Sequence, residues 1–184
     1  KAEILKPWEN HMKVLDKTFR TIWLSEDGYT VEIIDQTKLP HNFVIASLSN
    51  LEAASNAISE MLVRGAPLIG ATAAYGIALA MNEDSSDAGL EYAMKTLMAT
   101  RPTAVNLRWA LSEMVALIKP LQEHERIGAA YKKAAEICDQ DVEICSNIGN
   151  HGAKIITAIW RQKGEPSLSN GGVNILTHCN AGWL

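Results

Sequence analysis

APLIGATAAYGIALAM, residues 66–81, is the most apolar run of the chain. Its second residue is a proline, which suits the first turn of a helix because its missing N–H would have no helical partner there. The run is shorter than the ~20 apolar residues that a membrane-spanning helix needs. Gly70, Ala74 and Ala78 recur at intervals of four and form a small-residue ridge that allows close packing. We therefore expect residues 66–81 to form a buried core helix.

The residues on either side of this run predict further helices. Capping residues or proline mark their starts, and the expected ranges are 51–63, 88–100, 103–118 and 123–159. The last helix is expected to break near Gly149 and Gly152. Ahead of that break, a three-to-four spacing predicts one mostly apolar face, formed by Ile137, Asp141, Ile144 and Ile148.

The first third of the chain has the pattern of strands. Residues 21–24 and 30–34 are rich in β-branched residues and flank a turn that contains Asp27 and Gly28. This arrangement predicts a β-hairpin. Residues 42–48 are expected to add a third strand before the first helix.

The end of the chain has a different character. Residues 161–172 are polar and rich in glycine, proline and serine, which is typical of a linker or surface loop. Residues 173–179 are an apolar run that resembles the opening strand of an α/β unit. The sequence therefore predicts the α/β class, with a strand-plus-helical domain over residues 1–165 and the start of a second, truncated domain over residues 166–184.

Composition restricts the possible partners. The chain has 184 residues, of which 47% are hydrophobic, and a net charge of −4 without a strong basic cluster. A surface of that sign disfavours nucleic acid as a partner. Residues 1–19 do not have the pattern of a secretory signal. No apolar run is long enough to span a membrane, so we expect no membrane among the partners.

The three cysteines, without a signal peptide, predict reduced thiols in the cytoplasm. Cys138 and Cys145 are expected to share one helix face as buried core thiols. A metal site there would need His151 as a further ligand, and nothing specific in the sequence supports one. We expect no metal and no cofactor.

Arg64 and Gly65 directly precede the proline-initiated helix. The free N–H groups and the positive dipole end of such a helix can bind an anion, and an arginine can add a bidentate clamp on phosphate. The alternative is that Gly65 only permits a tight turn while Arg64 pairs with a surface acid.

The same arrangement recurs at Arg101, which precedes Pro102 and a helix whose first turn contains Thr103 and Asn106. Two such units in one short domain suggest an anionic ligand contacted twice. Local capping would explain each unit separately.

Cys179 follows the apolar run near the end of the chain. It would then lie at the carboxyl end of a strand, which is the edge where open α/β sheets bind ligands. A thiol becomes a useful base or nucleophile when positive charge lowers its pKa. The alternative is a buried, inert cysteine.

Three segments, taken in order, closely resemble signature stretches of the methylthioribose-1-phosphate isomerases. They are RGAPLIGATAAYG at 64–76, RPTAVNLRWA at 101–110 and LTHCNAG at 176–182. IDQTKLP at 34–40 and NIGNHG at 147–152 also look like segments of that family. The wider superfamily includes ribose-1,5-bisphosphate and 5-deoxyribose-1-phosphate isomerases and the regulatory alpha, beta and delta subunits of the exchange factor for translation initiation.

The resemblance implies an N-terminal domain of strands and helices, a larger Rossmann-like C-terminal domain with a parallel sheet, and a homodimer. By position, Cys179 matches the family's catalytic cysteine, and Asn180 follows it as a residue that helps to orient substrate. The segments that contact substrate in the family are matched by Arg64, Gly65, Ala66 and Arg101.

This sequence departs from the family pattern in two respects. Trp183 stands where many members have a small residue, which leaves the preference for the 5-substituent of the sugar open. The family's catalytic aspartate and an Asn-Lys pair that contacts substrate are not found within the 184 residues. We therefore expect a fragment that a C-terminal segment completes.

The reaction that the resemblance implies is the aldose–ketose isomerisation of 5-methylthioribose 1-phosphate in methionine salvage. Alternatives within the superfamily are an isomerase of 5-deoxyribose 1-phosphate or ribose 1,5-bisphosphate, and a non-catalytic regulatory subunit of the translation-factor type. The segment around Cys179 favours an enzyme, because the regulatory subunits lack it. A third alternative is that the chain alone serves as a binding or dimerisation module.

Overall fold

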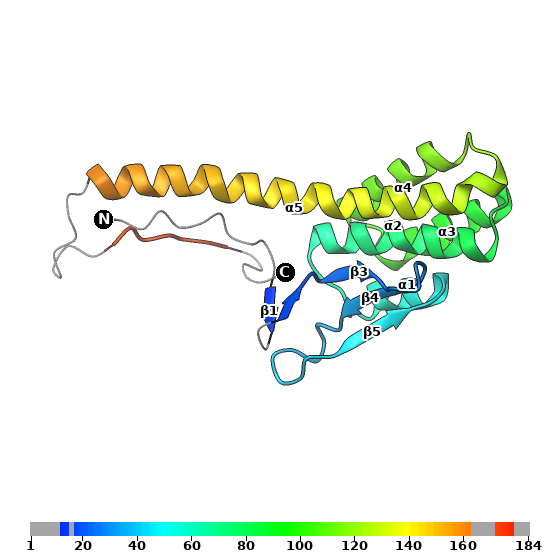
Figure 1. Ribbon diagram of the computed structural model, residues 1–184, viewed down its shortest axis with the longest axis horizontal. Coiled ribbons are helices and arrows are strands. Elements are labelled where there is room, and N and C mark those ends of the chain that lie inside the picture. Colours follow the sequence, from blue (N-terminus) through cyan, green and yellow to red (C-terminus); the bar gives the residue numbers. More distant parts are fainter. Residues whose placement is uncertain (1–11, 15–16, 163–171, 179–184) are drawn as a thin grey trace.

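A computed structural model describes residues 12–14, 17–162 and 172–178. Within these residues, five short strands come first and five helices follow (Figure 1). The strands are β1 (Met12–Val14), β2 (Lys17–Phe19), β3 (Ile22–Leu24), β4 (Val31–Ile34) and β5 (Ile45–Leu48). The helices are α1 (Leu51–Ser59), α2 (Ala66–Glu83), α3 (Asp87–Thr100), α4 (Val105–Ile118) and α5 (Glu123–Gln162).

The predicted hairpin is confirmed as β3 and β4, which pair in antiparallel register with Ile22 opposite Ile33. Their turn is fixed by Asp27, whose Oδ1 accepts hydrogen bonds from the N–H groups of Tyr29 and Thr30 at 2.9 and 2.8 Å. Gly28 has a φ of +82°, a conformation that glycine adopts without steric penalty. β5 adds the expected third strand, shorter at its start than predicted. A second small hairpin, β1–β2, was not predicted.

Helix α2 forms the centre of the molecule, as its sequence predicts. Every residue from Leu68 to Met81 is buried, and the helix contacts α1, α3, α4 and α5 as well as strand β3. A helix that is apolar all round has no face for solvent, so neighbours must surround it. Figure 1 shows the β3–β4–β5 sheet on one side of helices α2–α5. The strand-then-helix order confirms the expected class for this part of the chain.

The expected break near Gly149 and Gly152 is absent, because α5 continues from Glu123 to Gln162. Isolated glycines lower the stability of a helix without ending it, at about 1 kcal/mol each relative to alanine. The predicted linker therefore begins later than residue 161. Of the predicted apolar face, Ile137 is buried, whereas Ile144 and Ile148 are 56% and 65% exposed.

The exposed half of α5 extends past the other helices (Figure 1). We call residues 139–162, none of which is buried, the α5 overhang. Smaller differences from prediction concern helix ends, of which those of α1 and α4 are examples. α1 stops at Ser59 rather than 63, and α4 begins at Val105 rather than 103. Residues 172–178 form neither a helix nor a strand, so the strand expected over residues 173–179 is absent from the described part of the chain.

Candidate functional site

The first element of the candidate site is the start of α2. Gly65 is its N-cap, with φ +95° and ψ 133°, and its carbonyl accepts the N–H of Ile69 at 3.0 Å. A positive φ of this size favours glycine. No side chain caps this helix, so N–H groups of its first turn remain available to an anion. Arg64 and Ala66, on either side of Gly65, are exposed.

The second element is the start of α4. Arg101 is half-buried and forms the C-cap of α3, and the following turn closes with a bond from Ala104 N–H to the Arg101 carbonyl at 3.0 Å. Pro102 lies in that turn instead of opening the helix, and its carbonyl accepts a hydrogen bond from Arg108 Nη2 at 3.1 Å. Ala104 is the N-cap, and again no side chain caps the helix.

The two helix starts are packed side by side. A Cβ added to Gly70, in the first turns of α2, would lie 3.0 Å from the carbonyl oxygen of Asn106 in the first turn of α4. Arg64 and Arg101, which precede these turns, therefore lie toward the same end of the helical bundle. Among the described residues neither guanidinium takes part in an ion pair. The alternative of a surface ion pair for Arg64 thus has no partner there.

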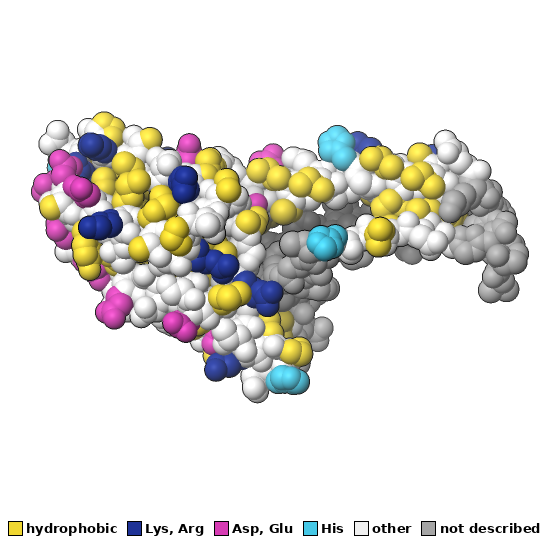
Figure 2. Space-filling model, turned by 180° about the vertical axis from the view of Figure 1, so that it is seen from behind, with side chains coloured by type: hydrophobic (Ala, Val, Ile, Leu, Met, Phe, Trp, Pro, Cys, Tyr) yellow, Lys and Arg dark blue, Asp and Glu magenta, His cyan; other side chains and the backbone are white. Residues whose placement is uncertain are grey.

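On the face shown in Figure 2, Lys and Arg side chains are spread over the main body, some of them near the α5 overhang, while Asp and Glu side chains lie mostly along the edge farthest from the overhang. Acidic side chains are therefore unevenly distributed over this face. An anionic ligand is repelled least where acidic side chains are few.

The two remaining predicted site residues, Cys179 and Asn180, lie outside the described residues. Their placement relative to the helix starts stays a prediction. The described segment ends at His178, directly before the cysteine.

A residue not singled out from the sequence is Gln36, in the loop after β4. It is only 8% exposed, and neither Nε2 nor Oε1 has a hydrogen-bond partner within the described structure. Its backbone N–H donates to the carbonyl of Leu62 at 2.9 Å, in the segment that leads to Arg64. Glutamine is usually exposed, so nothing in the residue type predicted this burial. The only sequence signal was its place in the family-like segment 34–40.

The two described cysteines do not form the shared buried face that we expected. Cys138 is buried, and burial raises the pKa of its thiol to about 12. Cys145 is exposed because it lies on the overhang, and its pKa is also raised, first by desolvation and then by Asp141. A thiol with a raised pKa is a poor nucleophile at neutral pH. Within the described residues, no cluster of three or more His, Cys, Asp and Glu side chains is arranged to hold a metal ion.

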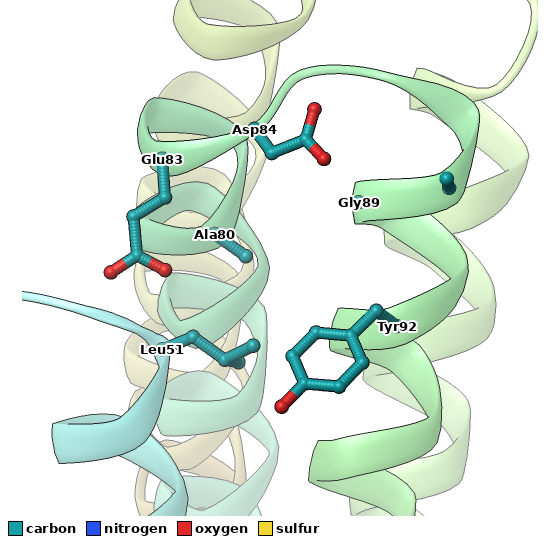
Figure 3. A pocket seen from close by; sticks show the side chains of 7 residues that line it. Leu51, Ala80, Glu83, Asp84, Gly89 and Tyr92 are labelled. Carbon is teal, nitrogen blue, oxygen red and sulfur yellow. The ribbon is translucent and has the colours of Figure 1, made fainter.

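A hollow of about 300 Å³ lies at the other end of α2, lined by Leu51, Ala80, Glu83, Asp84, Ala88, Gly89 and Tyr92. Figure 3 shows the side chains of Leu51 and Tyr92 pointing toward one another across it. Its acidic residues, Glu83 and Asp84, would repel a phosphate, and it is remote from the helix starts. We assign it no part in the candidate site. Among the described helices, none has both the length and the apolar character required to cross a bilayer.

Comparison with known proteins agrees with the resemblance found in the sequence. Methylthioribose-1-phosphate isomerase of Paramagnetospirillum magneticum is 59% identical over 173 residues, which are 94% of this chain and 46% of that protein. The protein of the same name from Escherichia coli O45:K1 is 53% identical with the same coverage. This chain thus spans about half the length of these curated relatives.

Two solved structures share the fold. The 5-methylthioribose 1-phosphate isomerase of Pyrococcus horikoshii OT3 superposes with a TM-score of 0.69 at 35% identity, covering 74% of this chain and 40% of that one. Translation initiation factor eIF-2B subunit delta from A. fulgidus gives a TM-score of 0.63 at 34% identity, covering 68% and 38%. Residues 62–184 match the Initiation factor 2 subunit family. This chain therefore belongs to the initiation factor 2 subunit family, and over most of its length it resembles methylthioribose-1-phosphate isomerases.

Proposed function

We propose that the complete protein is an aldose–ketose isomerase that converts 5-methylthioribose 1-phosphate to 5-methylthioribulose 1-phosphate, a step of methionine salvage. One observation carries the proposal: two uncapped helix starts, preceded by Arg64 and Arg101, pack side by side through Gly70 and Asn106. The 59% identity to a methylthioribose-1-phosphate isomerase supports the assignment of the ligand. Because this chain spans about half of that relative, the remaining site residues would come from further sequence.

In this proposal, the phosphate binds between the two helix starts. Arg64 and Arg101 donate to its oxygens, and the backbone at Gly65 and Ala66 allows close approach to the sugar. Fixing the phosphate at two points holds carbons 1 and 2 in one position, which lowers the entropic part of the barrier.

The chemical steps follow from the substrate. The phosphate on carbon 1 prevents simple ring opening, so an acid must protonate the ring oxygen as the bond between that oxygen and carbon 1 breaks. The hydrogen on carbon 2 ends on carbon 1, and the 2-hydroxyl loses its proton as carbon 2 becomes a carbonyl. Cys179 is the candidate group for the proton at carbon 2, as base for an enolate route or as support for a hydride shift. Asn180 would orient the substrate beside it.

The organisation of the whole protein is part of the same proposal. We infer that residues 1–165 form one domain and that residues 166–184 begin a Rossmann-like domain with a parallel sheet. The protein would act in the cytoplasm as a homodimer, without a cofactor. These inferences rest on the resemblance to isomerases of the same family.

A second candidate function is a regulatory subunit of the translation-factor type. It is favoured by the TM-score of 0.63 with an eIF-2B delta subunit. The segment around Cys179 argues against it, because a subunit without catalysis has no need of a reactive thiol there.

The test is an assay of the complete protein with methylthioribose, 5-deoxyribose and ribose 1-phosphates and ribose 1,5-bisphosphate in parallel. Turnover of the methylthio sugar is expected to be fastest. Cys179→Ala should abolish turnover, and Arg64→Ala should raise KM. Lys95→Ala removes a positive charge from an exposed position of α3 and is the control that should change neither. Undiminished turnover in Cys179→Ala would refute the role of that thiol.

A further inference from the structure

Gln36 is a buried polar residue whose unpaired side chain the described fold does not explain. Its side chain is removed from solvent, yet its amide nitrogen and carbonyl oxygen both lack a partner among the described residues. Buried polar side chains in folded proteins are nearly always hydrogen-bonded, so an unpaired carboxamide needs an explanation. A group that binds a ligand is one such explanation, because the ligand supplies the missing partners.

The position of Gln36 is fixed through the backbone. The N–H of Asp35 donates to the carbonyl of Val44 at 2.9 Å, and the N–H of Gln36 donates to the carbonyl of Leu62 at 2.9 Å. The Asp35 carboxylate in turn accepts the N–H and hydroxyl of Thr37 at 2.9 and 2.6 Å. This loop is therefore held against the segment that carries Arg64 and Gly65 to the start of α2.

The amide chemistry of Gln36 matches the proposed ligand. A carboxamide donates from Nε2 and accepts at Oε1, so it can bond a phosphate oxygen and a sugar hydroxyl at once. An arginine or an uncapped helix start can only donate. A phosphorylated sugar needs acceptors as well as donors from its site, and neither Arg64 nor Arg101 provides one.

We propose that Gln36 is a further substrate-binding residue, and that its buried carboxamide hydrogen-bonds the phosphorylated sugar held at the start of α2. The inference rests on the proposed function, because it assumes the same anion site. It assigns Gln36 a contact with ligand rather than a part in holding the fold together.

The test compares Gln36→Met with Gln122→Met in the complete protein. Methionine has a similar length and no amide, and Gln122 is an exposed glutamine in the turn before α5. Thermal unfolding is measured alone, with inorganic phosphate and with ribose 1-phosphate, and KM and kcat are measured with the methylthio sugar.

Gln36→Met is expected to melt at the same or a higher temperature than wild type without ligand, because unpaired buried amide groups are removed. It should lose most of the stabilisation by ribose 1-phosphate and raise KM about tenfold, the effect of one lost hydrogen bond to ligand. Gln122→Met should change neither. A lower melting temperature with unchanged KM and unchanged ligand stabilisation would overturn the inference, since Gln36 would then be paired within the protein or with buried water.

Failure of this inference is distinguishable from failure of the proposed function. If wild type turns over the methylthio sugar and Arg64→Ala raises KM, a normal KM in Gln36→Met refutes the role of Gln36 alone. If wild type turns over none of the sugars, the thermal shift with ribose 1-phosphate decides for Gln36. If Gln36→Met retains the rise in melting temperature with ribose 1-phosphate, or if wild type shows no such rise, the result counts against the role of Gln36.

Discussion

Arg126 on α5 donates a hydrogen bond from Nη2 to Oδ1 of Asp87, at the start of α3, over 2.7 Å. The arginine side chain is only 6% exposed, whereas that of Asp87 is 78% exposed. The same guanidinium also donates to the carbonyls of Ser85 at 2.9 Å and Leu121 at 3.0 Å. One buried cation therefore connects the α2–α3 loop, the α4–α5 loop and the first turns of α5.

Arg126→Met is expected to destabilise the protein by about 2–4 kcal/mol, because loop carbonyls lose their donors in a buried place. Asp87→Asn should cost less than about 1 kcal/mol, since an exposed carboxylate contributes little to an ion pair. Urea denaturation followed by far-UV circular dichroism measures both. Equal losses in the two variants would mean that the ion pair, and not the carbonyl bonds, accounts for the stability.

Gly89, in the first turn of α3, is a helix position where alanine should be harmful. A Cβ there would overlap the Asp84 carbonyl oxygen and lie 2.7 Å from Asp84 Cγ. Figure 3 shows the Asp84 carboxylate directed toward this turn. Gly89→Ala is therefore expected to lose roughly 1–3 kcal/mol through overpacking.

Gly128, on α5, is the matched control, because a Cβ there meets nothing within 4 Å. Gly128→Ala should gain about 0.5–1 kcal/mol, the usual advantage of alanine over glycine in a helix. The two variants are compared by thermal melting. A stable Gly89→Ala protein would show that the α2–α3 loop moves aside at little cost.

Sequence patterns predicted those parts of the fold whose causes are local. Asp27 and Gly28 specify a turn by themselves, and residues 66–81 are apolar on every side, so a hairpin and a central helix followed directly. The exposure of Ile144 was not predictable, because a three-to-four spacing shows which residues share a face and not whether another element covers it. The continuity of α5 through Gly149 was not predicted because an isolated glycine weakens a helix without ending it, so it is a poor signal for a helix end.

Part of the candidate site was likewise predictable from local sequence, and part was not. Arg64 and Arg101 were found because a basic residue before a helix start is visible in the sequence. The contact of Gly70 with Asn106 joins residues far apart in the chain, and the burial of Gln36 depends on a hydrogen bond to Leu62. No local pattern contains either relationship.

The two halves of α5 are expected to contribute unequally to stability. Ile137 is 4% exposed and packs in the core, whereas Ile148 on the overhang is 65% exposed. Ile137→Ala should cost about 2–5 kcal/mol, as is usual for removing buried methylenes. Ile148→Ala should stay within about 0.5 kcal/mol, as for other surface changes. Denaturant midpoints of the two variants provide the comparison, and a large loss at Ile148 would mean that another part of the protein or another copy covers the overhang.

Stability is expected to decline at alkaline pH. Burial raises the pKa of Cys138 and of Tyr131 to about 12, and burial likewise raises the pKa of Tyr75. The folded protein therefore keeps protons that the unfolded chain releases above its ordinary thiol and phenol pKa values. The contribution of these groups to the stability of the folded protein is complete below about pH 8 and is lost as the pH rises from about 9 toward 12.

Urea midpoints at pH 8, 9, 10 and 11 test this dependence. Replacing the buried thiol, as in Cys138→Ala, should flatten the decline between pH 9 and 11. The same change at exposed Cys145 should flatten it less, because Cys145 is partly solvated. A midpoint that does not change over this range would contradict the prediction.

The close approach of Gly70 to Asn106 links packing to ligand binding. In Gly70→Ala, a methyl group 3.0 Å from the Asn106 carbonyl oxygen must displace the first turn of α4, since backbone cannot move aside as a side chain can. In Gly76→Ala, farther along α2, the new methyl group would meet the Leu97 side chain at 3.0 Å. Both variants are expected to lose roughly 1–3 kcal/mol through overpacking.

Only one of the two should alter the site. Displacing the start of α4 moves Arg101 relative to Arg64, so Gly70→Ala should raise KM several-fold beyond Gly76→Ala in the complete protein. Melting temperature and KM are measured on the same preparations, which separates loss of fold from loss of geometry. If both variants raise KM in proportion to their instability, the helix starts do not act together on one ligand.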